Sequence, residues 1–137
     1  MNPTHYLSLA DVIAIHESAM RRLGAEPKAL RDEGLLESAV MRPQMAAYYE
    51  GADLIRQAAL LGVGISQAQA FLDGNKRTAY LALNTFLRMN GLSYTGDRLA
   101  LARQFEQIAE RENDPAAAID AFEAWLREFV QPRPDRG

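Results

Sequence analysis

The chain contains no cysteine among its 137 residues. This absence excludes disulfide frameworks, cysteine-based zinc sites and thiol nucleophiles, and it fits a reducing compartment. Histidine is scarce as well, with only His5 and His16. His16 lacks the second histidine four residues later that the helix of a zinc protease needs. We therefore expect His16 to be a partly buried or surface residue of a helix.

The sequence also lacks a strong basic excess. Lys and Arg number 15 against 18 Asp and Glu, a formal net charge of −3, whereas domains that bind nucleic acids are usually basic. No apolar run approaches the ~20 residues of a membrane span, and the first residues lack the basic and apolar regions of a signal peptide. We expect a cytoplasmic protein that binds neither nucleic acid nor membrane.

Length and composition predict one globular domain. A chain of 137 residues that is 48% hydrophobic can bury one core, and it is too short for two. No repeat, low-complexity block or interdomain linker divides it. We expect the domain to cover residues 1–130, and residues 131–137 to form a flexible C-terminal tail.

Apolar residues recur at helical spacing over nearly the whole chain, which predicts a mainly α fold of about six helices. The expected helices cover residues 9–23, 33–41, 53–68, 75–89, 98–110 and 115–130, with 92–95 as the only plausible short strand. Pro43 is expected to end the second helix. The next residues, 44–51, are then a loop or short hairpin that carries Tyr48 and Tyr49. In the third helix, Gly62 and Gly64 either weaken it or permit close helix packing.

The segment whose residues could bind a ligand or take part in a reaction is QAFLDGNKRT, residues 69–78, between two expected helices. Gly74 suits a tight turn into a helix whose first N–H groups have no partner within that helix. Those donors and the helix dipole form an anion site, where Asn75 adds a side-chain donor and Lys76 and Arg77 add two cations. Cations normally stabilise the other end of a helix, so their placement predicts an anionic ligand such as phosphate.

Asp73 precedes this cluster directly. A single carboxylate beside phosphate groups is a common way to hold Mg²⁺, so the segment predicts a nucleotide–metal site. The residues alone leave an alternative, in which Asp73 is only a helix N-cap and Lys76 and Arg77 are ordinary solvated side chains. The segment is not a Walker A loop, because the first glycine of that motif is missing.

The stretch FLDGNKRTA, Phe71 to Ala79, resembles the signature of the Fic/Doc superfamily, H-x-F-x-D/E-G-N-G/K-R. It is most similar to the death-on-curing (Doc) toxin branch, in which lysine follows asparagine. Residues 34–43 and 86–91 extend the resemblance, which covers roughly residues 6 to 128. It implies an all-α Fic fold in which Phe71 anchors the motif loop, Asp73 holds Mg²⁺, and the residues from Gly74 to Arg77 hold nucleotide phosphates.

Two departures from the AMP-transferring Fic enzymes point to the Doc branch. Lys76 replaces a glycine, and Tyr80 stands where those enzymes have a second arginine. Doc toxins share both changes, so the resemblance implies transfer of the γ-phosphoryl of ATP to a hydroxyl of a translation protein, elongation factor Tu in Doc toxins. It also implies an antitoxin whose C-terminal segment folds as a helix into an apolar groove. Tyr48 and Tyr49 lie where Fic proteins place a target-aligning flap, with ordinary loop packing as the alternative.

A further departure affects catalysis. The family's histidine, two residues before Phe71, is Gln69 in this chain. That histidine takes the proton from the attacking hydroxyl, and glutamine has no group that titrates near neutral pH. Loss of a general base lowers a rate by ~10²–10⁴-fold. We therefore expect a chain that is nearly inactive but still binds nucleotide and partners.

Two explanations of Gln69 remain open at this stage. It is either an inactivating change that lets a host produce a toxin, or the residue of a natural family member that acts by binding. The function has two alternatives as well: an AMP-transferase of the Fic type, or a catalytically silent module that binds an antitoxin and regulates its operon.

Overall fold

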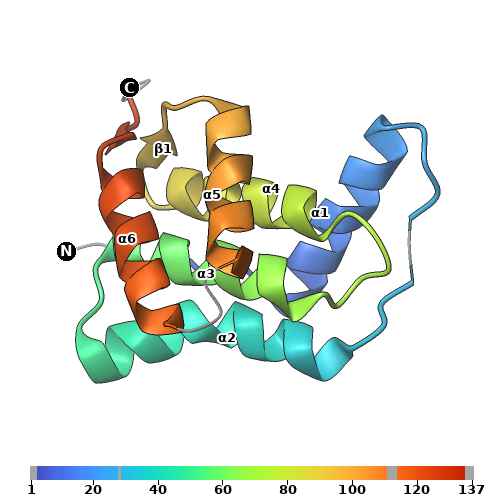
Figure 1. Cartoon of the computed structure of the whole chain (residues 1–137), viewed down its shortest axis with the longest axis horizontal. Helices are drawn as coiled ribbons and strands as arrows, with labels where there is room; N and C mark the ends of the chain where they lie inside the picture. Colours follow the sequence, from blue (N-terminus) through green and yellow to red (C-terminus); the bar gives the residue numbers. More distant parts are fainter. Residues whose placement is uncertain (1–2, 28, 111–113, 135–137) are drawn as a thin grey trace.

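The computed structural model describes residues 3–27, 29–110 and 114–134, which form six helices and one pair of short strands (Figure 1). In chain order the elements are α1 (Leu9–Arg22), α2 (Glu33–Glu50), α3 (Leu54–Ala68), α4 (Asn75–Met89), β1 (Leu92–Tyr94), α5 (Arg98–Glu110), α6 (Pro115–Arg127) and β2 (Val130–Pro132). The prediction of a mainly α fold is confirmed.

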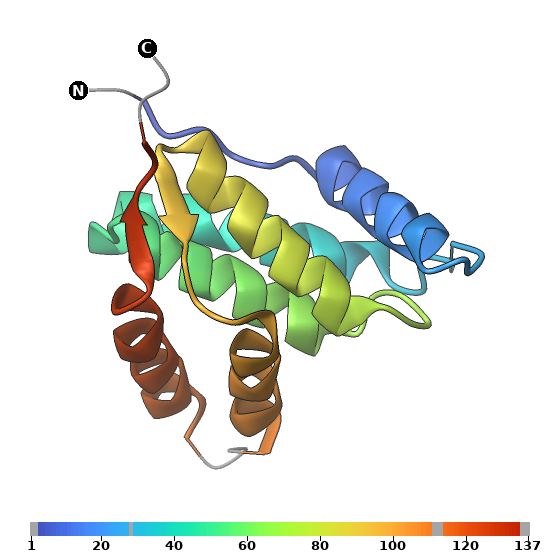
Figure 2. The same cartoon turned by 90° about the horizontal axis from the view of Figure 1, so that it is seen from above.

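Helices α3 and α4 form the centre of the molecule. They pack side by side, with α2 against α3 and α1 against α4. Helices α5 and α6 lie next to each other and cover the remaining side of this pair (Figures 1 and 2). The loop that joins α3 to α4 carries the motif, and it lies beside α1 in both views. The fold therefore places the motif loop at one end of the central helix pair.

Two glycines allow the neighbours of α3 to approach closely. A Cβ atom on Gly62 would lie 2.9 Å from Leu83 of α4 and 3.1 Å from Phe105 of α5. A Cβ atom on Gly64 would lie 3.1 Å from the Cβ atom of Ala39 in α2. All three distances are shorter than ordinary van der Waals contact. The glycines of α3 therefore serve close helix packing, one of the two roles predicted for them.

Helix ends follow the local sequence signals. The Ser8 hydroxyl accepts a hydrogen bond from the backbone N–H of Asp11, whose carboxylate accepts one from the N–H of Ser8, and together they form a capping box at α1. Gly24 follows the end of α1 with a φ of 73°. At α6, Asp114 caps the helix and Pro115 is its first residue.

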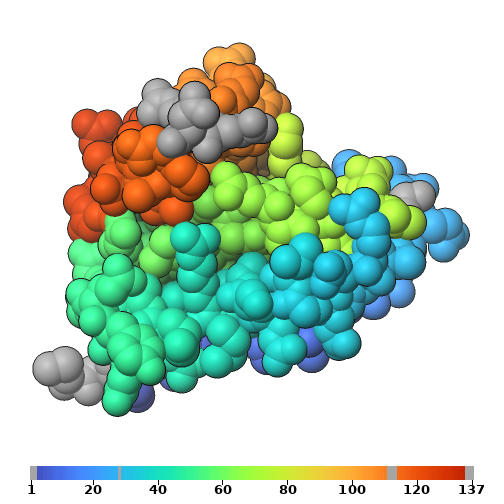
Figure 3. Space-filling view, turned by 60° about the horizontal axis from the view of Figure 1, so that its bottom comes forward, coloured from blue at the N-terminus to red at the C-terminus, as the bar shows by residue number. Residues whose placement is uncertain are grey.

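The prediction for α2 was wrong. Pro43 lies inside this helix, which continues to Glu50, so residues 44–50 are helical rather than a loop or hairpin. Proline lacks the N–H that would bond the carbonyl of Ala39. Packing offsets this loss, because Pro43 is buried and Ala39 sits against Gly64 of α3. Tyr48 and Tyr49 consequently lie on the last turn of α2, which crosses the near face of the molecule in Figure 3, coloured cyan to teal.

The C-terminal segment also differs from the prediction. Helix α6 ends at Arg127 instead of residue 130, and β2 pairs antiparallel with β1, with Tyr94 opposite Val130 and Leu92 opposite Pro132. Residues 131 and 132, expected in a flexible tail, therefore belong to a strand. Residues 135–137 of the expected tail lie outside the described residues.

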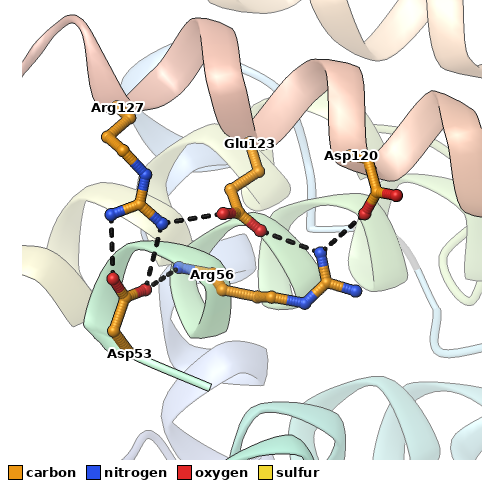
Figure 4. Close-up of polar contacts among 5 residues, drawn as sticks. All are labelled: Asp53, Arg56, Asp120, Glu123 and Arg127. Atoms are coloured by element: carbon orange, nitrogen blue, oxygen red, sulfur yellow. Dashed lines mark hydrogen bonds and ion pairs between the residues drawn. The ribbon is translucent and has the colours of Figure 1, made fainter. Parts of the chain in front are cut away.

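An ion-pair network joins the beginning of α3 to α6 (Figure 4). Asp53 caps α3 and accepts hydrogen bonds from Arg127, at 2.8 and 3.2 Å. Glu123 binds both Arg127, at 2.7 Å, and Arg56, at 2.8 Å, and Arg56 also binds Asp120. The hydrogen bonds from Arg127 hold the pKa of Asp53 below its ordinary value. Burial opposes ionisation of Glu123, but its bonds to the two arginines outweigh burial and lower its pKa.

Within the described part of the chain, none of the helices has the length and apolar character needed to cross a membrane.

Candidate functional site

The motif loop enters α4 through a left-handed residue. Gly74 is the N-cap of α4 with a φ of 82°, and no side chain caps the helix there. A Cβ atom on Gly74 would lie 2.8 Å from the sulfur of Met20 and 3.4 Å from the His16 ring, both on α1. Glycine is therefore required twice, for the backbone conformation and for the space. The uncapped N–H groups of the first turn remain available to an anion.

Asn75 fixes the loop with its side chain. Its Oδ1 atom accepts a hydrogen bond from the N–H of Phe71 at 3.0 Å, and its Nδ2 atom donates to the Phe71 carbonyl at 2.8 Å. Both residues are buried. Both backbone groups of buried Phe71 are therefore paired with the side chain of Asn75. Each end of the Asn75 side-chain amide makes one of these bonds, and the backbone N–H of Asn75 lies in the uncapped first turn of α4.

His16 of α1 contacts the motif loop at two residues, Phe71 and Asp73. Its ring stacks on Phe71, with centroids 3.7 Å apart and an angle of 6° between the planes. Its Nε2 atom lies 3.0 Å from the backbone oxygen of Asp73. Because a carbonyl only accepts hydrogen bonds, Nε2 carries the hydrogen. His16 is 1% exposed, so it cannot reach a substrate hydroxyl and does not replace the missing histidine of the motif.

The strand-like segment before α2 holds the other side of the loop. The N–H groups of Arg31 and Asp32 donate to the Ala70 carbonyl, at 2.6 and 3.2 Å. The Arg31 side chain donates to the backbone oxygen of Gln69 at 2.8 Å. These contacts fix the backbone of residues 69 and 70, where the sequence signalled no such support.

Gln69 occupies a strained backbone conformation. Its φ of 51° and ψ of 38° are left-handed, and among the described residues it is the one non-glycine with a positive φ. Such outliers concentrate at functional sites. Its Nε2 atom donates to the Ser66 carbonyl at 3.0 Å. Gln69 and Lys76 both line a pocket of about 350 Å³ between α3, α4, α5 and the beginning of α6, within the roughly 300–1,000 Å³ usual for small-molecule sites.

The charged residues of the motif gather at the same end of α4. One Asp73 carboxylate oxygen accepts the N–H of Gly74 at 2.7 Å, and the side chain is exposed. Lys76 lies 3.3 Å from Glu106 of α5, and both side chains are about half exposed. Arg77 is half-buried on the first turn of α4. The two cations therefore meet the helix N-terminus, where a bound anion would offset their unfavourable placement.

The carboxylate of the motif could hold a metal ion such as Mg²⁺ only together with the phosphate oxygens of a bound nucleotide. The described residues contain no group of three or more His, Cys, Asp or Glu that could hold a metal ion. Asp73 supplies a carboxylate on the loop directly before the anion site. Mg²⁺ accepts one or two carboxylates together with phosphate oxygens and water, so the residues present fit this ion and not a cage made of protein alone.

Comparison with known proteins identifies the family of this chain. A family model described as the Fic/DOC family matches residues 6–87, more than half of the chain. The chain belongs to the Fic/DOC family. It is 42% identical over 98 residues to a protein named Toxin Doc from Mycolicibacterium smegmatis, covering 69% of this chain and 71% of that protein. It is 35% identical over 88 residues to Protein kinase doc of Escherichia phage P1, covering 64% of this chain and 69% of that protein.

The predicted site residues divide into two groups in this Fic/DOC chain. Gln69, Phe71 and the residues from Asp73 to Arg77 lie together on the loop and the first turn of α4. Tyr48 and Tyr49 lie apart from them, 81% and 72% exposed, with their rings edge to face at 4.8 Å. Tyr49 lines another pocket, of about 440 Å³ between α2 and α6, and none of the residues lining it belongs to the motif.

Three residues at the site escaped the sequence interpretation. His16 was expected to be partly buried or at the surface, but it is fully buried, because it lies with Val12 on the inner side of α1. The roles of Arg31 and Glu106 could not be predicted from the sequence, because their partners at the site, Gln69 and Lys76, are distant in the sequence and come close only in the folded chain.

Proposed function

We propose that this chain is a Doc-type toxin of a toxin–antitoxin module and a protein kinase by ancestry, with impaired catalysis because Gln69 replaces the general base. The carrying observation is the uncapped N-terminus of α4, which combines free backbone donors with Lys76 and Arg77 in the first turn and Asp73 on the preceding loop. This constellation supports ATP as the phosphate donor. The names of the two relatives support the toxin and kinase assignments.

In this proposal the first turn of α4 holds the phosphates. The N–H groups of Asn75, Lys76 and Arg77 precede the first internal bond of the helix, which joins the Thr78 N–H to the Gly74 carbonyl at 2.9 Å. The Lys76 and Arg77 side chains add positive charge. Asp73 would hold Mg²⁺, which offsets phosphate charge when bound.

The reaction is transfer of the γ-phosphoryl group to a hydroxyl of a target protein, for which we propose elongation factor Tu. The hydroxyl oxygen forms a bond to the γ-phosphorus, the bond from that phosphorus to the bridging oxygen breaks, and ADP leaves. The hydroxyl proton needs an acceptor. Gln69 lies in the pocket with Lys76 but has no basic group, so the chain positions its substrates without supplying that acceptor.

The proposed partners use other surfaces. An antitoxin would present a helix to an apolar groove of the toxin. Tyr48 and Tyr49, exposed at the end of α2, would dock the target chain. Exposed aromatic side chains supply large contact areas at protein interfaces, which supports this role.

Labelled ATP tests the proposal. The Gln69→His variant is incubated with Mg²⁺, purified elongation factor Tu and ATP labelled at either the α- or the γ-phosphorus. We expect the target to carry label only from the γ-position. Label from the α-position would identify an AMP-transferase. No transfer from either position, with nucleotide still bound, would leave the chain as a binding module.

A further inference from the structure

Residue 69 ends helix α3 in a backbone conformation that few side chains favour. Gln69 is the C-cap of α3, with a φ of 51° and a ψ of 38°. A residue with a Cβ atom in this left-handed region loses free energy, and it stays there only where its surroundings hold it. The Gln69 side chain bonds the Ser66 carbonyl, but that bond exists only while glutamine occupies the position. Contacts to the backbone of residue 69 are therefore the ones that outlast a change of its side chain.

The segment before α2 supplies such contacts. The Arg31 guanidinium donates from Nη2 to the backbone oxygen of Gln69 at 2.8 Å. The backbone N–H groups of Arg31 and Asp32 donate to the carbonyl of Ala70, at 2.6 and 3.2 Å. Two successive carbonyl groups at the end of α3 are thus bound by one short segment, and Arg31 takes part in both contacts.

The bond from the Arg31 side chain is charged and uses a side chain at the surface. Arg31 is exposed, and none of the ion pairs among the described residues includes it. A hydrogen bond from an ionised donor is roughly twice as strong as one between neutral groups. Because the acceptor is a backbone atom, this bond is compatible with either glutamine or histidine at position 69.

We propose that Arg31 is a positioning residue for phosphoryl transfer, an inference that rests on the proposed function. Its bond to the carbonyl of residue 69 holds the left-handed backbone. That backbone places the side chain of residue 69 in the pocket that it lines together with Lys76. Loss of the guanidinium frees residue 69 to leave this conformation, and a displacement of ~1 Å can lower a rate by about 10²-fold. The first turn of α4, which holds the phosphates in this account, is not contacted by Arg31.

Steady-state kinetics of γ-phosphoryl transfer test this role in the Gln69→His background, with Mg²⁺–ATP and purified elongation factor Tu. Arg31→Met removes the donors and keeps a long side chain, whereas Arg31→Lys keeps a charged donor. Arg103→Met is the matched control, because Arg103 is exposed on α5 and does not line the pocket. We expect Arg31→Met to lower kcat by about 10–10²-fold with an unchanged KM for ATP. Arg31→Lys should recover part of the rate, and Arg103→Met should match the parent.

A second measurement needs no activity. The NMR resonance of the Gln69 carbonyl carbon in the original chain should shift in Arg31→Met and stay in place in Arg103→Met. An unmoved resonance in Arg31→Met would show that the bond does not hold residue 69, and the inference would fail.

The kinetic outcomes separate this inference from the proposed function. If the Gln69→His parent transfers phosphate and Arg31→Met keeps its kcat, the inference alone is overturned. A raised KM for ATP at constant kcat would also overturn it, because Arg31 would then act in nucleotide binding. A Gln69→His parent without any transfer would overturn the proposed function, and the inference with it.

Discussion

The His16 imidazole donates a hydrogen bond from Nε2 to the backbone oxygen of Asp73, at 3.0 Å, while its Nδ1 atom is buried without a hydrogen-bond partner among the described residues. A buried polar atom without a partner lowers stability. A group that is retained despite such a penalty often serves function. We infer that His16 is a positioning residue that fixes the motif loop beneath the anion site.

The His16→Phe variant separates these effects. Phenylalanine retains stacking on Phe71, removes the unpartnered nitrogen and loses the bond to Asp73, so we expect the free energy of unfolding to change by less than about 1 kcal/mol. Amide exchange at Gly74 should accelerate and ATP affinity should fall. The control is His5→Phe, at an exposed position. Unchanged exchange and affinity in His16→Phe would contradict the positioning role.

Asn75 is expected to stabilise the fold as well as to belong to the phosphate-binding motif. The Asn75→Ala variant leaves the N–H and the carbonyl of buried Phe71 without their partners, so unfolding by urea should show a loss of about 2–5 kcal/mol. Asn84→Ala is the matched control, because Asn84 makes a single bond, to the Tyr80 carbonyl. A loss no larger than that of the control would show that the clamp is weak.

The contact of Gly64 with Ala39 predicts a coupled pair. Gly64→Ala gains about 1 kcal/mol of helix propensity but crowds a 3.1 Å contact, and overpacking costs about 1–3 kcal/mol. We expect net destabilisation. The loss should shrink when Ala39→Gly removes the opposing methyl group. Additive effects in this double-mutant cycle would show that the two positions do not touch.

The ion-pair network predicts a loss of stability in acid. The pKa of Asp53 is lowered in the folded protein, first by the hydrogen bond from Arg127. Its stabilisation is therefore present above the unfolded pKa of about 4 and disappears as the pH falls through the lower folded value. Asparagine also caps helices well, so Asp53→Asn should lower stability by about 0.5–1 kcal/mol at pH 7 and by progressively less as the pH falls through the folded pKa of Asp53.

A matched variant controls for the cap. Asp32→Asn alters the N-cap of α2, which forms no ion pair in the part of the chain that the structure describes. Thermal unfolding between pH 2 and pH 7 compares the two variants. A difference between Asp53→Asn and the original chain that stays constant over this range would contradict the pH dependence.

Local patterns predicted most of the helices because caps and apolar spacing act within one turn. The boundaries of α4 and α5 are examples. Pro43 and the strand at Val130 were misread because tertiary packing decides both. Ala39 and Gly64 hold α2 together across the proline, and β1 supplies a partner for a segment that shows no strand pattern of its own.

The candidate site was predictable where its residues are contiguous. The chemistry from Asp73 to Arg77 follows from residue types around one helix start. The contact between Arg98 and Tyr80 was not predictable, because the two residues lie on different helices. The support of Gln69 by Arg31 depends on folding in the same way.

The backbone at position 69 makes the central claim testable without loss of the fold. Histidine and asparagine tolerate the left-handed region better than most residues, so Gln69→His and Gln69→Asn should both fold at least as well as the original chain. Asparagine supplies no base and is the matched control.

The most direct measurement is the rate at which each chain transfers labelled γ-phosphoryl from Mg²⁺–ATP to elongation factor Tu. Gln69→His should exceed both the original chain and Gln69→Asn by about 10²–10⁴-fold, the usual contribution of a general base. Equal rates for the histidine and glutamine forms would contradict the claim that Gln69 is the cause of impaired catalysis.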